Sequence, residues 1–285
     1  MLLRELLTQP QHLPTIPTSV QSLIDSFADD DVSIGKIARL ISTDPGMSAK
    51  LLRLANSAYF RVARTVGTVD DAVTMLGSTM VRNLVIGSGL AGTFKTAPGL
   101  DIQQFWRYTL STACAGRWLA GCSRQGVELG FMVGLLHGIG QFVMRTGMTQ
   151  AMLDMDATVH PLDARRALLE KDRFGFGYAE VGAELARQWH FPEIIAQGIS
   201  GVPEPTSPIA AVVHLAAWSA RAAVFDTPPE ELAARYPEAA ALILGIDKSW
   251  LPESIQGTGS RCRTTDPMPD MAELTAGLEE MLGAG

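Results

Sequence analysis

One ten-residue stretch of the sequence constrains the fold more than any other. It runs from Phe131 to Gly140, is apolar almost throughout, and contains one imidazole, that of His137. Each glycine costs a helix about 1 kcal/mol relative to alanine, so Gly134, Gly138 and Gly140 need a packing reason or a functional one. The pattern predicts a buried helix packed closely against its neighbours. His137 is then either a metal ligand or a hydrogen-bonded core residue.

The rest of the chain predicts an all-α fold. Apolar residues recur at spacings of three and four in nearly every segment, and alternating strand patterns are absent. Residues that can cap helix starts are frequent; they include Ser33, Asp44-Pro45, Asp101 and Ser207-Pro208. Small residues at 111, 113, 115 and 116 would let the helix that starts after Asp101 lie close beside the one that holds His137.

Helix-breaking residues suggest that the chain is divided into three parts. The stretch 96–100 contains Pro98-Gly99 and reads as a loop, so we expect an N-terminal helical lobe at 1–97, a second helical lobe at 98–225, and a helical C-terminal extension at 226–285. The extension ends with an apolar stripe at helical spacing, formed by Met271, Leu274, Leu278 and Met281. That stripe needs a surface to cover, either on its own chain or on a partner.

Composition narrows the class of protein. With 47% hydrophobic and 19% charged residues, the chain reads as an ordinary globular protein. We found no run of about 18 apolar residues and no signal-peptide pattern, and therefore expect a cytoplasmic protein without a membrane segment. Three cysteines without metal-type spacing indicate neither a disulfide framework nor a zinc site.

Charge argues against a general nucleic-acid binder. The net charge is −7, although residues 1–97 hold nine basic and eight acidic residues, and so carry +1 against −8 for the remainder. A local basic group in this first part reads either as a solvated helix face or as an interaction surface. Together with a neighbouring asparagine, the candidate surface consists of Lys50, Arg53, Asn56, Arg61 and Arg64.

Several motifs, in this order, resemble the HDOD family, the HD-related output domain of bacterial signalling proteins. They span roughly residues 12 to 225 and comprise Leu13-Pro14, Ile16-Pro17, Asp44-Pro45, Leu54-Ala-Asn56-Ser57, Leu76-Gly77, Phe105-Trp106-Arg107, Gly134-Leu-Leu-His137, Phe174-Gly175, Val181-Gly182, Trp189 and Pro192. The resemblance implies that the second lobe is an HD-like helical domain.

The parent HD superfamily consists of metal-dependent phosphohydrolases, and this chain departs from the superfamily's ligand pattern. Such chemistry needs several histidine and carboxylate ligands around a divalent ion. By the resemblance, Tyr108 stands where a first histidine is expected, His137-Gly138 has lost the aspartate of the doublet, Tyr178 replaces a later histidine, and Ala217 replaces an aspartate. The paired histidines that often follow are absent as well, with Val202-Pro203 in their place.

The sequence therefore predicts a non-catalytic signalling module that acts through protein-protein interaction, with other signalling proteins as partners, no cofactor and no bound metal. His137 is expected to be a neutral imidazole, hydrogen-bonded to a backbone carbonyl or to a hydroxyl such as that of Tyr108 or Thr109. The first alternative is a residual metal-dependent phosphohydrolase, using ligands such as Asp172, Glu180 or Glu184, and the second is a pocket that binds a nucleotide or another anion without hydrolysing it. Binding to nucleic acid through Lys50, Arg53, Arg61 and Arg64 ranks last, because the whole chain is acidic.

Overall fold

Every regular element that the computed structural model describes is a helix. The structure describes residues 3–9, 13–28, 33–60, 62, 64–248, 251 and 268–278. Its helices are α1 (Leu3–Thr8), α2 (Thr18–Asp25), the 3₁₀ turn η2 (Ser26–Ala28), α3 (Ile34–Ser42), α4 (Pro45–Ala55), α5 (Val69–Leu76), α6 (Ser78–Thr93), α7 (Ile102–Cys122), α8 (Val127–Leu136), α9 (Gly140–Gly147), α10 (Thr149–Asp156), α11 (Arg166–Phe174), α12 (Tyr178–Gln188), α13 (Glu193–Gly201), α14 (Pro208–Val224), α15 (Pro229–Ala234), α16 (Glu238–Leu244) and α17 (Met271–Thr275). The predicted all-α class is confirmed.

Side-chain caps start the helices where the sequence predicted them. Ser33 accepts a hydrogen bond from the backbone N–H of Lys36, and Asp44 accepts one from Met47. Asp101 and Ser207 do the same at the starts of α7 and α14. Each cap satisfies a backbone donor that has no partner inside its own helix.

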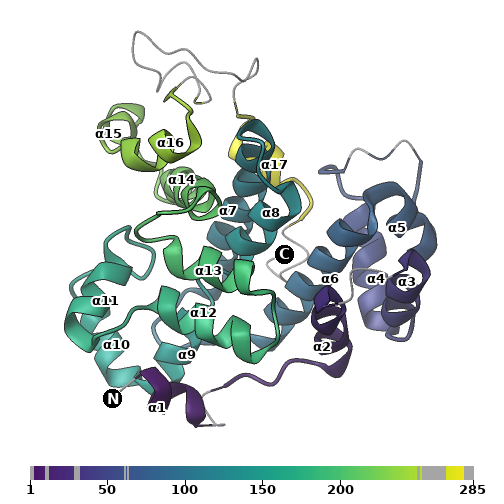
Figure 1. Cartoon of the computed structure of the whole chain (residues 1–285), viewed down its shortest axis with the longest axis horizontal. Coiled ribbons are helices and arrows are strands. Elements are labelled where there is room, and N and C mark those ends of the chain that lie inside the picture. Colours follow the sequence, from purple (N-terminus) through teal and green to yellow (C-terminus); the bar gives the residue numbers. More distant parts are fainter. Residues whose placement is uncertain are drawn as a thin grey trace.

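Helices α2 to α6 gather on one side of the molecule, and α7 to α14 form the larger group on the other (Figure 1). The connection from α6 to α7 is a loop, as predicted for residues 96–100. The division into parts at 97 and 225 stays a prediction.

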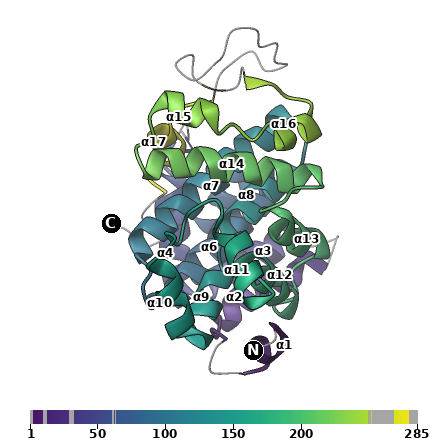
Figure 2. The same ribbon diagram turned by 90° about the vertical axis from the view of Figure 1, so that its left-hand side faces the viewer.

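Glycines allow α7, α8 and α14 to pack at short range in the middle of the molecule. A Cβ atom added at Gly134 of α8 would lie 2.7 Å from Cα of Ala113 and 2.9 Å from the carbonyl oxygen of Thr112, both on α7. One added at Gly116 would lie 2.9 Å from the carbonyl oxygen of Gly130. The expected close approach of these helices is therefore confirmed, and Figure 2 shows α7 and α8 behind α14.

The single helix predicted across residues 131–140 is wrong, because α8 ends at Leu136 and α9 begins at Gly140. Between them the backbone tightens, with hydrogen bonds from Ile139 to Leu136 and from Gln141 to Gly138. Glycine favours such a break. The close contact between α9 and α12 also requires glycine at position 140, because a Cβ at Gly140 would overlap the carbonyl oxygen of Tyr178. His137 occupies the C-cap position at this break.

Both ends of the described chain pack against distant segments. Helix α1 lies beside α9 and α12 instead of α2 (Figures 1 and 2), and Leu6 is fully buried there. At the other end Leu274 and Leu278 are buried beside α7, and the backbone N–H of Tyr59 donates to the carbonyl of Ala276. The apolar stripe therefore covers a surface of its own chain; Met281 lies outside the described residues.

One stretch, Val127–Gly147, is apolar enough over 21 residues to cross a membrane by length and composition. It is not a continuous apolar run, because Glu128, Gln141 and Arg145 interrupt it. Of its most apolar window, 83% is buried inside the fold. This stretch comprises α8 and α9, so its hydropathy is explained by its place in the protein core.

Candidate functional site

His137 lies at the centre of a chain of hydrogen bonds that joins α8, α7 and α14. The ring is 1% exposed. Its Nδ1 lies 2.6 Å from the carbonyl oxygen of Gly134, and its Nε2 lies 3.0 Å from the hydroxyl of Tyr108 on α7. The same hydroxyl accepts a hydrogen bond of 2.7 Å from Nη1 of Arg221 on α14.

The chemistry of the two end groups fixes the direction of these bonds. A carbonyl oxygen can only accept and a guanidinium can only donate, so Nδ1 of His137 must carry the proton that Gly134 accepts. Nε2 is then an acceptor for the hydroxyl proton of Tyr108, whose oxygen accepts from Arg221. Both ring nitrogens of His137 are thus used within the chain.

Burial keeps this histidine neutral. Desolvation lowers the pKa of His137 to about 4, although the hydrogen bond to Gly134 acts in the opposite direction and raises it. Burial also raises the pKa of Tyr108, and the nearby positive charge of Arg221 offsets part of that rise. At neutral pH the pair is an uncharged imidazole and an uncharged phenol, as predicted for His137. Of the two predicted hydroxyl partners it is Tyr108 that bonds the ring, whereas the hydroxyl of Thr109 donates to the carbonyl of Phe105.

The remaining positions of the predicted degenerate site contribute no ligand for a metal. Gly138 has no side chain, and a Cβ there would lie 3.0 Å from the ring of Phe105. Ala217 is fully buried on α14, one turn before Arg221. Tyr178 is buried at the start of α12, where its burial raises its pKa and the charges of Tyr108 and Arg221 act on it as well. The structure therefore brings Tyr108 and His137 into contact and places Tyr178 near them.

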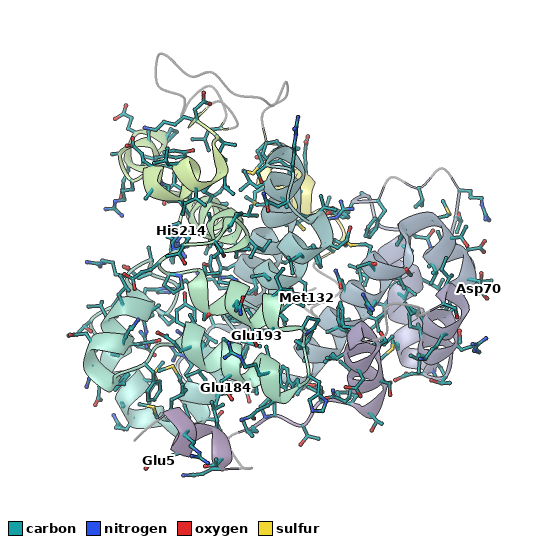
Figure 3. The ribbon with its side chains drawn as sticks, in the orientation of Figure 1. Glu5, Asp70, Met132, Glu184, Glu193 and His214 are labelled. Carbon is teal, nitrogen blue, oxygen red and sulfur yellow. The ribbon has the colours of Figure 1, made fainter. Side chains whose placement is uncertain are left out.

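The residues present do not fit a divalent metal ion. Nowhere in the described part of the chain do three or more histidine, cysteine, aspartate or glutamate side chains form a group that could hold one. The other carboxylates suggested by the sequence have partners of their own or face solvent: Glu180 accepts from the backbone of Gly177 and pairs with Lys171, Glu184 pairs with Arg187, and Asp172 is exposed. Figure 3 shows Glu184 and Glu193 on neighbouring helices, α12 and α13.

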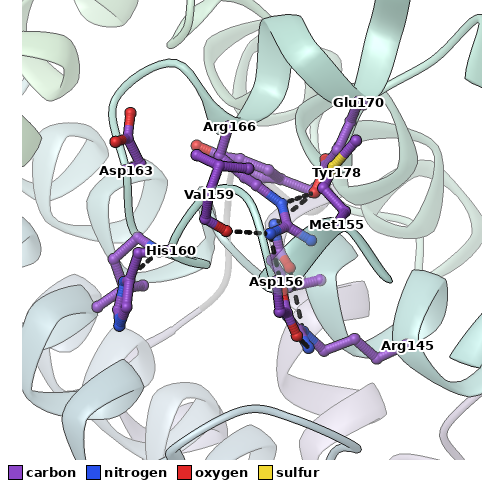
Figure 4. A network of polar contacts seen from close by, with 12 residues as sticks. Arg145, Met155, Asp156, Val159, His160, Asp163, Arg166, Glu170 and Tyr178 are labelled. Atoms are coloured by element: carbon purple, nitrogen blue, oxygen red, sulfur yellow. Dashed lines mark hydrogen bonds and ion pairs between the residues drawn. The ribbon is translucent and has the colours of Figure 1, made fainter. Parts of the chain in front are cut away.

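A buried ionic network that the sequence did not predict lies beside this site (Figure 4). Arg145 of α9 binds both carboxylate oxygens of Asp156, at 2.7 and 2.9 Å, and also donates to the carbonyl of Pro98. Arg166 donates to the same aspartate and to Glu170, each at 2.7 Å. Both arginine side chains are fully buried.

This network connects to the site through Glu170. Its second carboxylate oxygen accepts from the backbone N–H of Tyr178 at 2.8 Å, and so fixes the start of α12. Burial raises the pKa of Glu170, and the bond from Arg166 opposes this rise. One signal could have revealed the network: Arg145 is an isolated charge within an apolar segment, and a buried charge needs partners.

The candidate interaction surface is only partly available for binding. Asn56 uses its amide within its own chain, donating to the carbonyls of Leu52 and Val66 and accepting from the N–H of Val66. Arg64 forms an ion pair with Asp71 at 2.8 Å. Lys50 and Arg53 both lie on α4, and Arg61 lies outside the described residues. The role of this surface stays a prediction.

This arrangement is a helical domain whose central histidine is bonded to a tyrosine, and the tyrosine in turn to an arginine. The fold is of the HD-like class. The family model described as HDOD domain matches residues 13–205. The chain belongs to the HDOD family, which confirms the resemblance found in the sequence.

Solved structures agree with this assignment. A protein of Shewanella amazonensis SB2B that carries the provisional name phosphohydrolase is 27% identical, with a TM-score of 0.70 over 98% of this chain and 96% of that one. An HDOD domain protein with unknown function from Geobacter sulfurreducens shares the fold, at 23% identity and a TM-score of 0.67 over 85% of this chain and 87% of that one.

A curated relative is considerably longer than this chain. An uncharacterized protein of Treponema pallidum (strain Nichols) is 25% identical over 228 residues, which are 77% of this chain and 44% of that protein. The chain thus spans less than half the length of that relative.

Proposed function

We propose that this protein is a non-catalytic regulatory member of the HDOD family, which acts by binding another signalling protein. The observation that carries the proposal is the environment of His137. Its Nε2, the nitrogen a metal would need, accepts from Tyr108, and Tyr108 is bonded to the guanidinium of Arg221. A divalent ion at this nitrogen would have to displace a hydroxyl and lie near a permanent positive charge, which repels it.

An assay of metal binding and hydrolysis tests whether the protein lacks catalytic activity. The full chain is loaded with Mn²⁺, Ni²⁺ or Fe²⁺ and offered phosphomonoesters, nucleotides and cyclic dinucleotides. The expected result is less than one equivalent of bound metal and no hydrolysis that depends on His137. His137→Ala is compared with His190→Ala, whose side chain is 75% exposed. Hydrolysis that His137→Ala abolishes and His190→Ala retains would overturn the proposal.

A capture experiment tests the binding role. The surface to change is α4, where Lys50 and Arg53 lie. The wild-type chain and a Lys50→Glu/Arg53→Glu variant are used to capture proteins from the native cell, with Arg173→Glu on the exposed part of α11 as the control. We expect one bound protein that the control retains and the double variant loses. A set of captured proteins that is the same for all three chains would argue against this surface.

A second candidate function, residual phosphohydrolase activity, is favoured by one observation only. The Shewanella protein that is 27% identical carries the provisional name phosphohydrolase. The activity assay above distinguishes the two functions, because only the second requires turnover.

A further inference from the structure

A cationic pocket opens between α14 and the helices that follow it. It has a volume of about 550 Å³, within the range of roughly 300–1,000 Å³ that is usual for small-molecule sites. Figure 1 shows α15 and α16 beside α14, and Figure 3 labels His214 on α14. The residues that line the pocket include Asp163, Arg165, His214, Trp218, Arg221, Phe225 and Arg235.

The charge of this lining is opposite in sign to that of the whole chain. Three arginines against one aspartate give the lining +2, whereas the chain carries −7. The aspartate is itself engaged, because Asp163 accepts from both the backbone and the guanidinium of Arg165. These bonds lower the pKa of Asp163, and the charge of Arg221 lowers it further.

Arg221 is the cation in this pocket that forms no direct ion pair among the described residues, although the charge of Asp163, which is bound to Arg165, acts on it. Its side chain is half-buried, its guanidinium donates to the neutral hydroxyl of Tyr108, and among the described residues it forms no ion pair with a carboxylate. A charge withdrawn from water without an opposite charge is costly. An anion from solution would offset that cost, and a guanidinium suits phosphate oxygens well because its N–H groups form a rigid fork.

The apolar part of the pocket offers flat surfaces. Phe225 is 42% exposed although it is a large apolar side chain, and the ring of His160 packs against it edge-on at 5.0 Å. Trp218 lines the same pocket from α14. Aromatic faces stack on planar rings and favour ligands of that shape.

His214 adds a group that can select a ligand by hydrogen bonding. Its Nδ1 lies 2.7 Å from the carbonyl oxygen of Val202, and therefore carries a proton. Burial lowers the pKa of His214, so that the ring is neutral and Nε2 is an acceptor. The lining thus combines anion-binding guanidinium groups, stacking surfaces and a hydrogen-bond acceptor.

We propose that this pocket binds a small organic phosphate with a planar ring, the chemical class of the nucleotides, without a metal ion and without hydrolysis. Arg221 holds the phosphate together with Arg165 and Arg235, and Phe225 packs on the ring. Arg221 also bonds Tyr108, which bonds His137 at the break between α8 and α9. Occupancy of the pocket therefore acts on the core of the domain.

Calorimetric titration of the full chain in low salt with EDTA tests the site. The probes are AMP and GMP, the matching nucleosides, and inorganic phosphate. We expect saturable binding of at least one nucleotide, no binding of its nucleoside, and at least tenfold weaker binding of inorganic phosphate. Each charge-assisted bond accounts for about tenfold or more in affinity, so Arg221→Ala and Arg165→Ala should each weaken binding by about that factor.

Control variants separate an effect on ligand binding from an effect on folding. Arg221→Ala removes a bond to the core, whereas Arg165 is 73% exposed, so Arg165→Ala keeps the test valid if the first variant fails to fold. Arg187→Ala, which removes an arginine paired with Glu184 and Glu193 on the surface of α12 and α13, should bind like the wild type.

Three results would contradict the proposed phosphate-binding site. They are the absence of binding for both nucleotides at millimolar concentration, equal binding of inorganic phosphate, and unchanged affinity in both arginine variants. The inference does not rest on the proposed function: metal-dependent turnover would contradict the non-catalytic role and leave binding in EDTA intact, whereas the absence of binding would leave the non-catalytic role untouched.

Discussion

Two hydrogen bonds occupy the ring of His137 and fix its orientation, while burial keeps the ring neutral. The bond to Gly134 is local, since both residues belong to the end of α8. The bond to Tyr108 crosses to α7 and continues to Arg221 on α14. At the scale of single residues, the site is thus a polar connection between three helices inside an apolar core.

Removing one oxygen atom should break this connection. In Tyr108→Phe, Nε2 of His137 loses its donor and Arg221 loses its acceptor, and buried polar groups without partners cost about 1–3 kcal/mol. We expect the free energy of unfolding in urea to fall by that amount. Tyr178→Phe is the control, because among the described residues the hydroxyl of Tyr178 has no hydrogen bond. Equal losses in the two variants would contradict the role given to Tyr108.

The depressed pKa of His137 predicts a pH dependence of stability. The pKa is 6.5 in a model peptide and about 4 in the folded protein, so between these values the unfolded chain binds more protons. Stability should therefore fall as the pH falls from about 6.5 to about 4, by up to about 3 kcal/mol from this group. His137→Gln, which cannot titrate there, should show a smaller loss over the same window in urea titrations. Parallel curves for the two proteins would contradict the assignment.

At the scale of helices, glycine decides how closely α7 and α8 approach. Gly134 lies against the backbone of Ala113, and no side chain movement can make room for a larger residue there. Gly92 of α6 differs, since its missing Cβ would meet only the end of Lys50, at 3.9 Å. The same residue type therefore has a packing role at one position and none at the other.

One substitution at both glycines separates these cases. Gly134→Ala should destabilise the protein by about 1–3 kcal/mol, because overpacking forces α7 and α8 apart. Gly92→Ala should be neutral or stabilise by up to about 1 kcal/mol, because alanine is the better helix former. Thermal melts followed by circular dichroism measure both. A destabilisation of the same size in both variants would be inconsistent with the close packing.

The sequence predicted local structure well because local chemistry determines it. Ser33 and Asp44 cap their helices through their own side chains, so their positions could be read directly. The break at His137 was missed, since it depends on how α9 meets α12 at Gly140. The neutral state of His137 and its hydroxyl partner could be predicted, because few groups can donate a hydrogen bond to a buried imidazole. Tyr108 could be named because it occupies a position of the family pattern. Arg221 occupies no such position, and only the packing of α14 brings it to Tyr108.

At the scale of the whole molecule, the C-terminal segment connects the two groups of helices. Its residues pack beside α7, and the carbonyl of Ala276 accepts from Tyr59 in the loop after α4. Gly277 adopts a positive φ of 77°, and a Cβ there would lie 2.7 Å from Cβ of Ser57. This close approach requires glycine.

Loss of this contact should loosen a loop far away in sequence. Leu278 is fully buried, so Leu278→Ala should cost about 2–5 kcal/mol. Hydrogen exchange should become faster at Tyr59, whose N–H is bonded to this segment. Leu242→Ala is the control, because Leu242 is 81% exposed. Unchanged exchange at Tyr59 in Leu278→Ala would contradict the connection.

The packing of α1 has a consequence for how the chain is made. Leu6 is buried beside α9 and α12, and the carbonyl of Leu7 accepts from Gln188. A ribosome therefore synthesises this first helix long before it synthesises the surface that the helix will cover. During that interval the leucines of α1 are exposed to water and to other proteins in the cell, and folding can be completed only after the later helices have emerged.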